Sequence, residues 1–221
     1  MQVLIDAREG LPTATTIAQE RANWTTYTNR LNKACPTNMQ IEDAVFGTPQ
    51  GDVGVRIYRP AAAATVAPVI VYLHGGGFMK GDLDSSDAVA WGFAENCCAL
   101  VISVDYRLTP EHPYPAAFND VYSVIEHVAS NANTLGIDPK RIAVAGDSAG
   151  GSLTAAACLA ARDRGGPTIT AQVLVYPVTG LTPESDTYIV NTVTIRLRTS
   201  SMRRNNCSYA LIANKKLIHY I

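Results

Sequence analysis

The sequence predicts an α/β fold in which a mostly parallel sheet carries helices on both faces. Three continuous apolar runs support this prediction, because strands buried on both faces lack the polar alternation of half-exposed strands. They are APVIVYLH (67–74), ALVISVDYR (99–107) and ITAQVLVYPV (169–178). Helical segments separate the runs, and strands that alternate with helices form parallel sheets.

The first 60 residues predict helices followed by a strand pair. Residues 13–34 are rich in Ala, Thr, Arg and Glu and favour one or two helices. MQIEDAVF (39–46) and DVGVRIYRP (52–60) are typical of strands, and the turn signal GTPQGD joins them. A short connection of this kind indicates an antiparallel pair.

Three further helices complete the alternation. One is expected around residues 85–97, and a second, from about 116 to 133, follows the proline-rich loop LTPEHPYP. The stretch LGIDPKRIAVAGDSAGG then predicts a loop, a short strand and a turn. A helix of small residues, SLTAAACLAARD (152–163), leads to the last apolar run.

Composition bounds the class of protein. The 221 residues are enough for one domain with a substantial core. The net charge of −1 gives no reason to expect nucleic acid or an anionic membrane as a partner. No apolar run approaches the roughly 20 residues of a membrane span, and the N-terminal sequence MQVLIDAREGLPT lacks the pattern of a secretory signal.

The five cysteines indicate the redox compartment. They are odd in number and lack metal-ligand spacing, and the adjacent Cys97 and Cys98 stand in an apolar context that favours buried free thiols. The sequence therefore predicts a reducing, cytoplasmic location and no metal site.

The stretch GDSAG places Ser148 in the pattern G-x-S-x-G, after an expected strand and before an expected helix. A nucleophile on such a tight turn has a strained backbone, and the flanking Gly146 and Gly150 leave room for it. Ser148 would then lie at a helix N-terminus, where exposed N–H groups favour developing negative charge. The alternative is a serine that merely packs a glycine-rich turn; the placement favours the nucleophile.

Three consecutive glycines follow the strand at 67–74, in the stretch HGGGF. Acyl transfer passes through a tetrahedral oxyanion, which requires backbone N–H groups with no side chain in the way. We expect Gly76 and Gly77, together with Ala149, to donate these hydrogen bonds, with Gly75 in a supporting position. His74 is expected to hold this loop by hydrogen bonding rather than to act as the general base.

These motifs resemble those of the hormone-sensitive-lipase-like (bacterial family IV) carboxylesterases of the α/β-hydrolase fold. The resemblance implies a serine hydrolase that cleaves short-to-medium acyl esters, a small-molecule substrate, through an acyl-enzyme at Ser148 and without a cofactor. It also implies an N-terminal helical cap formed by residues 1–38. It covers residues from about 10 to 186 and comprises, in family order, HGGGF (74–78), DYRLTPEHPYPAAFND (105–120), GDSAGG (146–151) and VYPVTG (175–180).

Three charged residues near these motifs are expected to be structural. The resemblance implies that Arg107 and Glu111 form ion pairs beneath the site. Asp147 is expected to brace the turn at Ser148. It is not expected to be the catalytic acid, because it directly precedes the nucleophile and cannot reach a histidine that also reaches Ser148.

An activated serine requires a base and an orienting acid, which in α/β-hydrolases follow the serine in the order acid, then histidine. Neither family motif for these residues occurs here. Asp163 lies far along the helix that leaves the turn, so Glu184 or Asp186 remains as the candidate acid. The one later histidine, His219, is the candidate base, although its context KKLIHYI is more typical of a solvated terminus. The acid and base therefore stay unidentified.

The charge distribution changes near residue 186. All 19 acidic residues precede residue 187, whereas residues 187–221 contain six of the 18 basic residues and neither Gly nor Pro. We therefore expect a hydrolase domain over 1–186 and an atypical C-terminal tail over 187–221, with the last strands of the fold missing. A frameshift, an alternative tail and a truncated gene product would each produce this pattern.

Three functional hypotheses follow. The chain is an active serine carboxylesterase whose tail supplies the base, a catalytically impaired or dead member of the family, or a ligand-binding module that uses the hydrolase pocket. They differ in whether a histidine reaches Ser148.

Overall fold

The computed structural model describes residues 2–178 of the chain. The predictions for the tail over 187–221, including the missing last strands, lie outside the described residues. So do the candidate acids Glu184 and Asp186 and the candidate base His219. The division into domains at residue 186 therefore stays a prediction.

A single twisted sheet forms the centre of the described chain, with its strands in the order β1-β2-β4-β3-β5-β6. The pairs β1/β2 and β2/β4 are antiparallel, whereas β4, β3, β5 and β6 run parallel to one another. The mostly parallel sheet and the antiparallel N-terminal pair are thus confirmed. The strands are β1 (Met39–Thr48), β2 (Gly51–Pro60), β3 (Ala67–Leu73), β4 (Leu100–Asp105), β5 (Ile137–Asp147) and β6 (Ile169–Val175).

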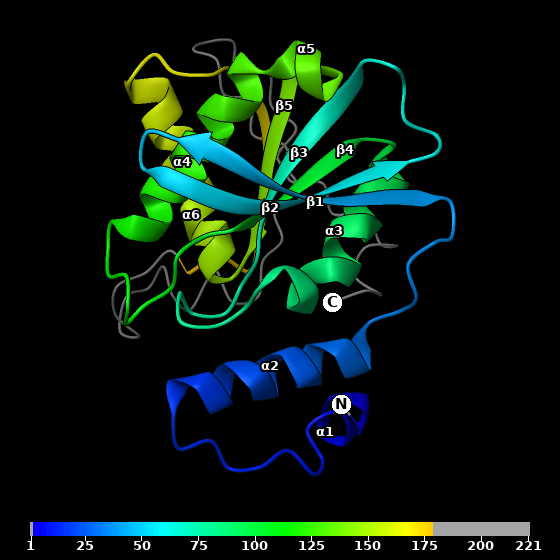
Figure 1. Ribbon diagram of the computed structural model, residues 1–221, viewed down its shortest axis with the longest axis vertical. Coiled ribbons are helices and arrows are strands. Elements are labelled where there is room, and N and C mark those ends of the chain that lie inside the picture. The colour runs from blue at the N-terminus through cyan, green and yellow to red at the C-terminus, as the bar shows by residue number, and fades with distance from the viewer. Residues whose placement is uncertain (1, 179–221) are drawn as a thin grey trace.

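Helices cover both faces of this sheet (Figure 1). Helix α3 packs against one face, and α4 and α6 pack against the other. The helices are α1 (Gln2–Asp6), α2 (Ile17–Leu31), α3 (Leu83–Cys97), α4 (Ala116–Ser130), α5 (Ala132–Leu135) and α6 (Ala149–Asp163). None of these described helices combines the length and the apolar character that crossing a bilayer requires.

Strand β3 shows how the sequence fills both sides of the sheet. Val69, Val71 and Leu73 point into the core beneath α4 and α6. Ile70 and Tyr72 point into the second core, beneath α3. Since successive side chains of a strand alternate between faces, a strand covered on both sides must be apolar at nearly every position.

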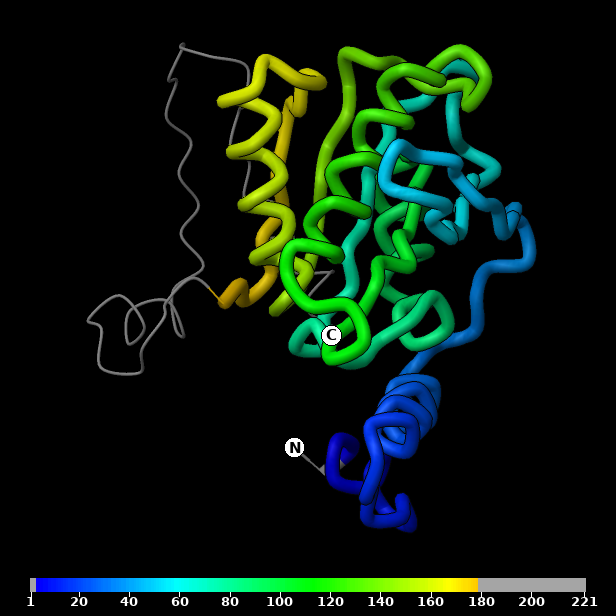
Figure 2. Tube along the Cα trace, turned by 60° about the vertical axis from the view of Figure 1, so that its left-hand side comes forward, coloured from blue at the N-terminus to red at the C-terminus, as the bar shows by residue number. Residues whose placement is uncertain are grey.

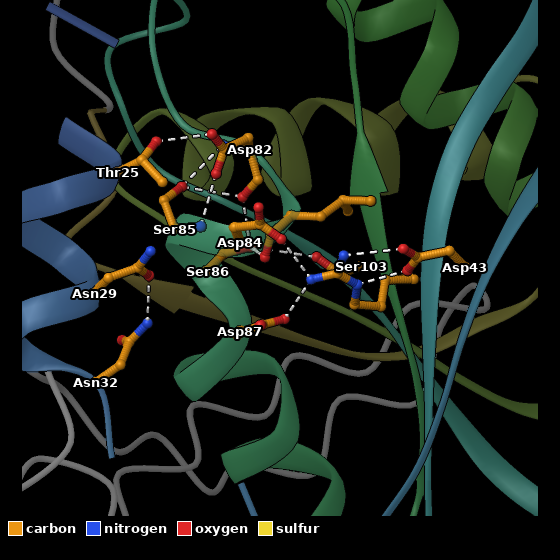
Figure 3. A network of polar contacts seen from close by, with 12 residues as sticks. Thr25, Asn29, Asn32, Asp43, Asp82, Asp84, Ser85, Ser86, Asp87 and Ser103 are labelled. Atoms are coloured by element: carbon orange, nitrogen blue, oxygen red, sulfur yellow. Dashed lines mark hydrogen bonds and ion pairs between the residues drawn. The ribbon is translucent and has the colours of Figure 1, made fainter. Parts of the chain in front are cut away.

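Polar contacts fix the N-terminal hairpin β1–β2 to helix α3. Arg56 on β2 forms ion pairs with Asp43 on β1 and with Asp84 and Asp87 on α3, at 2.5, 2.8 and 2.9 Å. The hydroxyl of Tyr58 also donates to Asp87. Figure 3 shows Asp43, Asp84 and Asp87 of this network beside the start of α3. The Arg56 guanidinium thus links the β1–β2 hairpin to helix α3, which is not part of the sheet.

Helices α1 and α2 project from one end of the body (Figure 2). Helix α2 begins at Thr16, whose side chain accepts a hydrogen bond from the Gln19 amide, and it has no fully buried residue. The expected N-terminal helices are therefore present, and α2 lies as a separate layer next to α3.

The structure differs from the sequence expectations in three places. Strand β5 begins at Ile137, inside the expected loop, because Ala67 pairs with Ile137 before the register shifts. The expected helix over 116–133 ends at Ser130, and α5 follows as a separate turn. Cys97 and Cys98 are exposed rather than buried, because the helix ends there and Cys98 adopts the left-handed conformation (φ 49°) that terminates it.

Candidate active site

Ser148 lies between the end of β5 and the start of α6. Its backbone has φ 49° and ψ −116°, an unfavourable conformation for a residue with a side chain. The Ser148 amide donates to the carbonyl of Val175, 2.9 Å away at the end of β6. The serine therefore lies at the carboxyl edge of the parallel strands, as the G-x-S-x-G pattern predicts.

Close packing explains the two glycines that flank Ser148. A Cβ atom on Gly146 would lie 2.3 Å from the carbonyl oxygen of Gly150. A Cβ atom on Gly150 would lie 2.0 Å from the carbonyl oxygen of Leu73, at the end of β3. The first turn of α6 is thus packed directly against the strand that leads into HGGGF.

The glycine-rich loop begins at the same edge of the sheet. Leu73 pairs with Gly146 across β3 and β5, so residues 74–77 and Ser148 leave neighbouring strands at the same level. Gly76 has φ 131° and Gly77 has φ 64°, and a Cβ atom on Gly76 would lie 1.9 Å from the Lys80 carbonyl oxygen. The loop can therefore turn back on itself only with glycine at this position.

Asp147 connects the loop to the turn at Ser148. Its Oδ1 accepts hydrogen bonds from the Gly75 amide at 3.0 Å and from the Tyr72 hydroxyl at 2.7 Å. Its Oδ2 accepts a third from the Tyr176 hydroxyl at 3.2 Å. These contacts agree with the expected bracing role and extend it, because the carboxylate joins the ends of β3, β5 and β6.

His74 is buried beneath the loop, with an exposed fraction of 1%. Its ring stacks on Tyr106 at a centroid distance of 4.3 Å, and its Nδ1–H donates to the Gly75 carbonyl at 2.8 Å. The Tyr106 hydroxyl donates to the His74 carbonyl at 2.6 Å. Burial lowers the pKa of His74, so the imidazole is neutral near pH 7. These contacts agree with a structural histidine.

Arg107 and Glu111 each form an ion pair, but not with each other. Arg107 binds the buried carboxylate of Asp120, with its Nη2 2.6 Å from Oδ1, and its backbone amide donates to the same carboxylate. Glu111 binds Arg21 of helix α2, at 2.6 Å. Each residue therefore forms an ion pair, and the second pair joins α2 to the body.

The described residues provide no metal centre. They contain no group of three or more His, Cys, Asp or Glu side chains that could hold a metal ion. Asp163, at the far end of α6, forms an exposed ion pair with Arg162, in agreement with its expected place away from the turn.

Comparison with known proteins identifies the family. The model of a family with the α/β-hydrolase fold matches residues 70–216, which is more than half of the chain and extends beyond the last of the sequence motifs. The chain belongs to this α/β-hydrolase family.

Named relatives and solved structures agree with this assignment. Esterase LipI of Mycobacterium tuberculosis is 48% identical over 143 residues, covering 64% of this chain and 45% of LipI. Carboxylesterase NlhH of the same organism is 52% identical over 128 residues, covering 58% of this chain and 40% of NlhH. A hyperthermophilic esterase from the archaeon Pyrobaculum calidifontis superposes with a TM-score of 0.75 at 38% identity, covering 82% of this chain and 59% of that structure. The chain thus spans less than half the length of LipI and less than half the length of NlhH.

Several residues of the site were not singled out by sequence analysis, among them Tyr72, Tyr106, Tyr176 and Arg21. Tyr72 and Tyr106 lie within runs that predict only buried strands, and Arg21 lies in a helix with no motif. A signal for the tyrosines did exist, because a buried phenol requires a hydrogen-bond partner and so indicates a polar group nearby.

Proposed function

We propose that this chain is a serine hydrolase of the carboxylesterase type that cleaves short-to-medium acyl esters. The observation that carries the proposal is the strained backbone of Ser148 at the junction of β5 and α6, beside a glycine loop bound to the preceding Asp147. Ser148 would attack the ester carbonyl and form an acyl-enzyme, which water then hydrolyses.

Gly76, Gly77 and Ala149 would stabilise the oxyanion with their backbone amides, and Gly75 would support the loop. Two findings favour this assignment: Gly75 is hydrogen-bonded to Asp147, and Ala149 opens helix α6 immediately after the nucleophile. Losing one such donor costs typically about 100- to 1000-fold in rate. No cofactor is required for this chemistry. Asp186 and His219 are the candidates for acid and base.

The same proposal places the protein in a reducing, cytoplasmic compartment. The thiols of Cys35, Cys97 and Cys98, which form no disulfide within the described part of the chain, support this part.

The proposal is tested with a fluorophosphonate ester probe on the full chain. We expect covalent labelling that is lost in Ser148→Ala, because the phosphonate reacts only with an activated serine. His219→Ala and Asp186→Asn should each slow labelling strongly if these residues supply the base and acid. Absence of labelling in the folded wild-type chain would contradict the proposal and favour a ligand-binding module or an inactive member of the family.

A further inference from the structure

The carboxylate of Asp147 holds the glycine loop through one oxygen only. Oδ1 accepts from the Gly75 amide, whereas Oδ2 accepts from Tyr176. A carboxylate can rotate about its terminal bond, which has a broad torsional preference. The hydrogen bond to Gly75 therefore positions the loop only as well as Oδ1 itself is fixed.

A second donor fixes that oxygen. The Tyr72 hydroxyl lies 2.7 Å from Asp147 Oδ1, the same atom that accepts from Gly75. Tyr72 is only 2% exposed, and its ring packs against Phe93 of α3 with centroids 5.8 Å apart. Its hydroxyl has few alternative positions, since the ring is held within the core beneath α3.

The protonation state of Tyr72 suits this role. Burial raises the pKa of Tyr72 well above its ordinary value, so the hydroxyl keeps its proton throughout the neutral range and always donates. A hydrogen bond to a charged acceptor is stronger than one between neutral groups, and a low-dielectric surrounding strengthens it further.

We propose that Tyr72 is a positioning residue for the oxyanion loop: its buried hydroxyl fixes Asp147 Oδ1, which holds the Gly75 amide and thereby the loop over residues 74–77. The catalytic part of this inference rests on the proposed function of Ser148. The positioning part concerns the folded chain and stands without it.

The chain offers two matched controls for Tyr72→Phe. Tyr176→Phe removes a hydroxyl from the same carboxylate but from Oδ2, the oxygen that does not hold Gly75. Tyr58→Phe removes a buried hydroxyl from a different aspartate, Asp87, in the network of Figure 3. The first control compares the hydrogen bond that Oδ1 accepts with the one that Oδ2 accepts. The second control shows how much of the effect of Tyr72→Phe comes simply from losing a buried hydroxyl.

The first measurement is amide hydrogen exchange of the full chain, read in a peptide that covers residues 74–81. Tyr72→Phe should accelerate exchange in this peptide by about 10-fold, a local opening that leaves the core strands protected. Tyr176→Phe should change it by less than about threefold, because the Tyr176 hydrogen bond is longer, at 3.2 Å against 2.7 Å, and comes from a side chain that is 54% exposed and exchanges with water. Tyr58→Phe should leave it unchanged. A melting curve confirms that each variant is folded.

The second measurement is the rate at which the fluorophosphonate probe labels Ser148, resolved into probe affinity and maximal rate. A displaced oxyanion donor weakens only the transition state, so Tyr72→Phe should lower the maximal rate by about 10- to 100-fold and leave probe affinity unchanged. A loss of general packing would instead change both quantities or neither.

The outcomes separate the two proposals. No labelling of the wild-type chain would contradict the proposed function, and the exchange data would then decide the role of Tyr72 alone. Wild-type exchange at 74–81 in a folded Tyr72→Phe variant would overturn the positioning role, whatever the labelling shows. Equal effects of Tyr72→Phe and Tyr176→Phe would also overturn it, because the proposal assigns the anchoring of Asp147 to the shorter, buried hydrogen bond of Tyr72.

Discussion

Helices α2 and α6 both contact the elements around the glycine loop, but they are held there by different interactions. Helix α6 buries eight of its 15 residues and packs its first turn against the end of β3. Helix α2 has the same length and has no buried residue. Its contacts with the body are largely polar: Arg21 to Met79, Thr109 and Glu111, Glu20 to Lys80, and Thr25 to Asp82. The Lys80 ammonium also lies 4.7 Å from the centre of the Trp24 ring.

This difference separates a rigid part of the site from a detachable one. Buried apolar contacts and close backbone packing are lost only when the body unfolds, whereas exposed polar contacts open and close locally. Exposed ion pairs are also screened by salt. We therefore expect the turn at Ser148 to be as stable as the fold and α2 to open independently.

The largest expected effect is a loss of stability on disturbing the contact between α6 and β3. Gly150→Ala would place a Cβ atom 2.0 Å from the Leu73 carbonyl oxygen, so the helix and the strand would have to separate. We expect a loss of about 3–5 kcal/mol in the free energy of unfolding, measured by urea denaturation.

Gly92→Ala is the matched control for this change. Gly92 lies within α3, and a Cβ atom there would meet nothing within 4 Å. This variant should gain up to about 1 kcal/mol, because alanine is the better helix former. Equal effects of the two variants would contradict the claim that close packing with β3 is what requires Gly150.

A smaller effect is expected at the anchor of α2. Arg21→Ala removes four hydrogen bonds to Met79, Thr109 and Glu111. Proteolysis in the segment between α2 and β1 should accelerate, whereas the unfolding midpoint of the body stays unchanged. Arg21→Lys should be intermediate, because lysine keeps the charge but cannot form the two-pronged contact with a carboxylate. A parallel fall in the unfolding midpoint would show that α2 and the body form one cooperative unit.

The smallest expected effect is the pH dependence of the local opening of α2. Arg21 lowers the pKa of Glu111 below its ordinary value of 4.5, and Lys80 does the same for Glu20. A lowered carboxylate pKa contributes stability that is fully present above 4.5 and is lost as the pH falls through the lower, folded value. Amide exchange in α2, corrected for the intrinsic rate, should therefore increase below pH 4.5. In Glu111→Gln the increase in exchange at low pH should be weaker. An increase identical to that of the wild-type chain would show that Glu111 does not cause it.

The sequence predicted the fold almost completely because the decisive signals were local. The apolar run at 67–74 and the turn between 46 and 52 each specify their structure within a few residues, and β3 and the β1–β2 pair confirm them. The start of β5 was missed because its first residues include Pro139 and two basic side chains, a composition typical of loops. The strand nevertheless begins at Ile137, which pairs with Ala67 before the register shifts and pairing resumes at Ile142.

The contacts of the candidate site were less predictable. The motifs placed Ser148 and the glycine loop on neighbouring strand ends, but they did not provide the partners of Asp147. Tyr72 is 75 residues away from Asp147 in the sequence, and Tyr176 is 29 residues away. Likewise, the partner of Glu111 is Arg21, 90 residues earlier. Hydrogen bonds over such separations depend on the register of the sheet and on how the helices pack against the body, which no local pattern in one sequence specifies.

The pairing of β3 with β5 also has a consequence for the order in which we expect the chain to fold. Strands β1 and β2 meet through a tight turn, so their ends need to close only a very short loop. Leu73 and Gly146 lie about 70 residues apart in the chain, and closing a loop of that length costs more entropy and slows folding. The glycine loop and Ser148 are on opposite sides of this long-range contact. We therefore expect them to come together late in folding, after the local hairpin has formed, so that a partly folded chain would contain both motifs without a site.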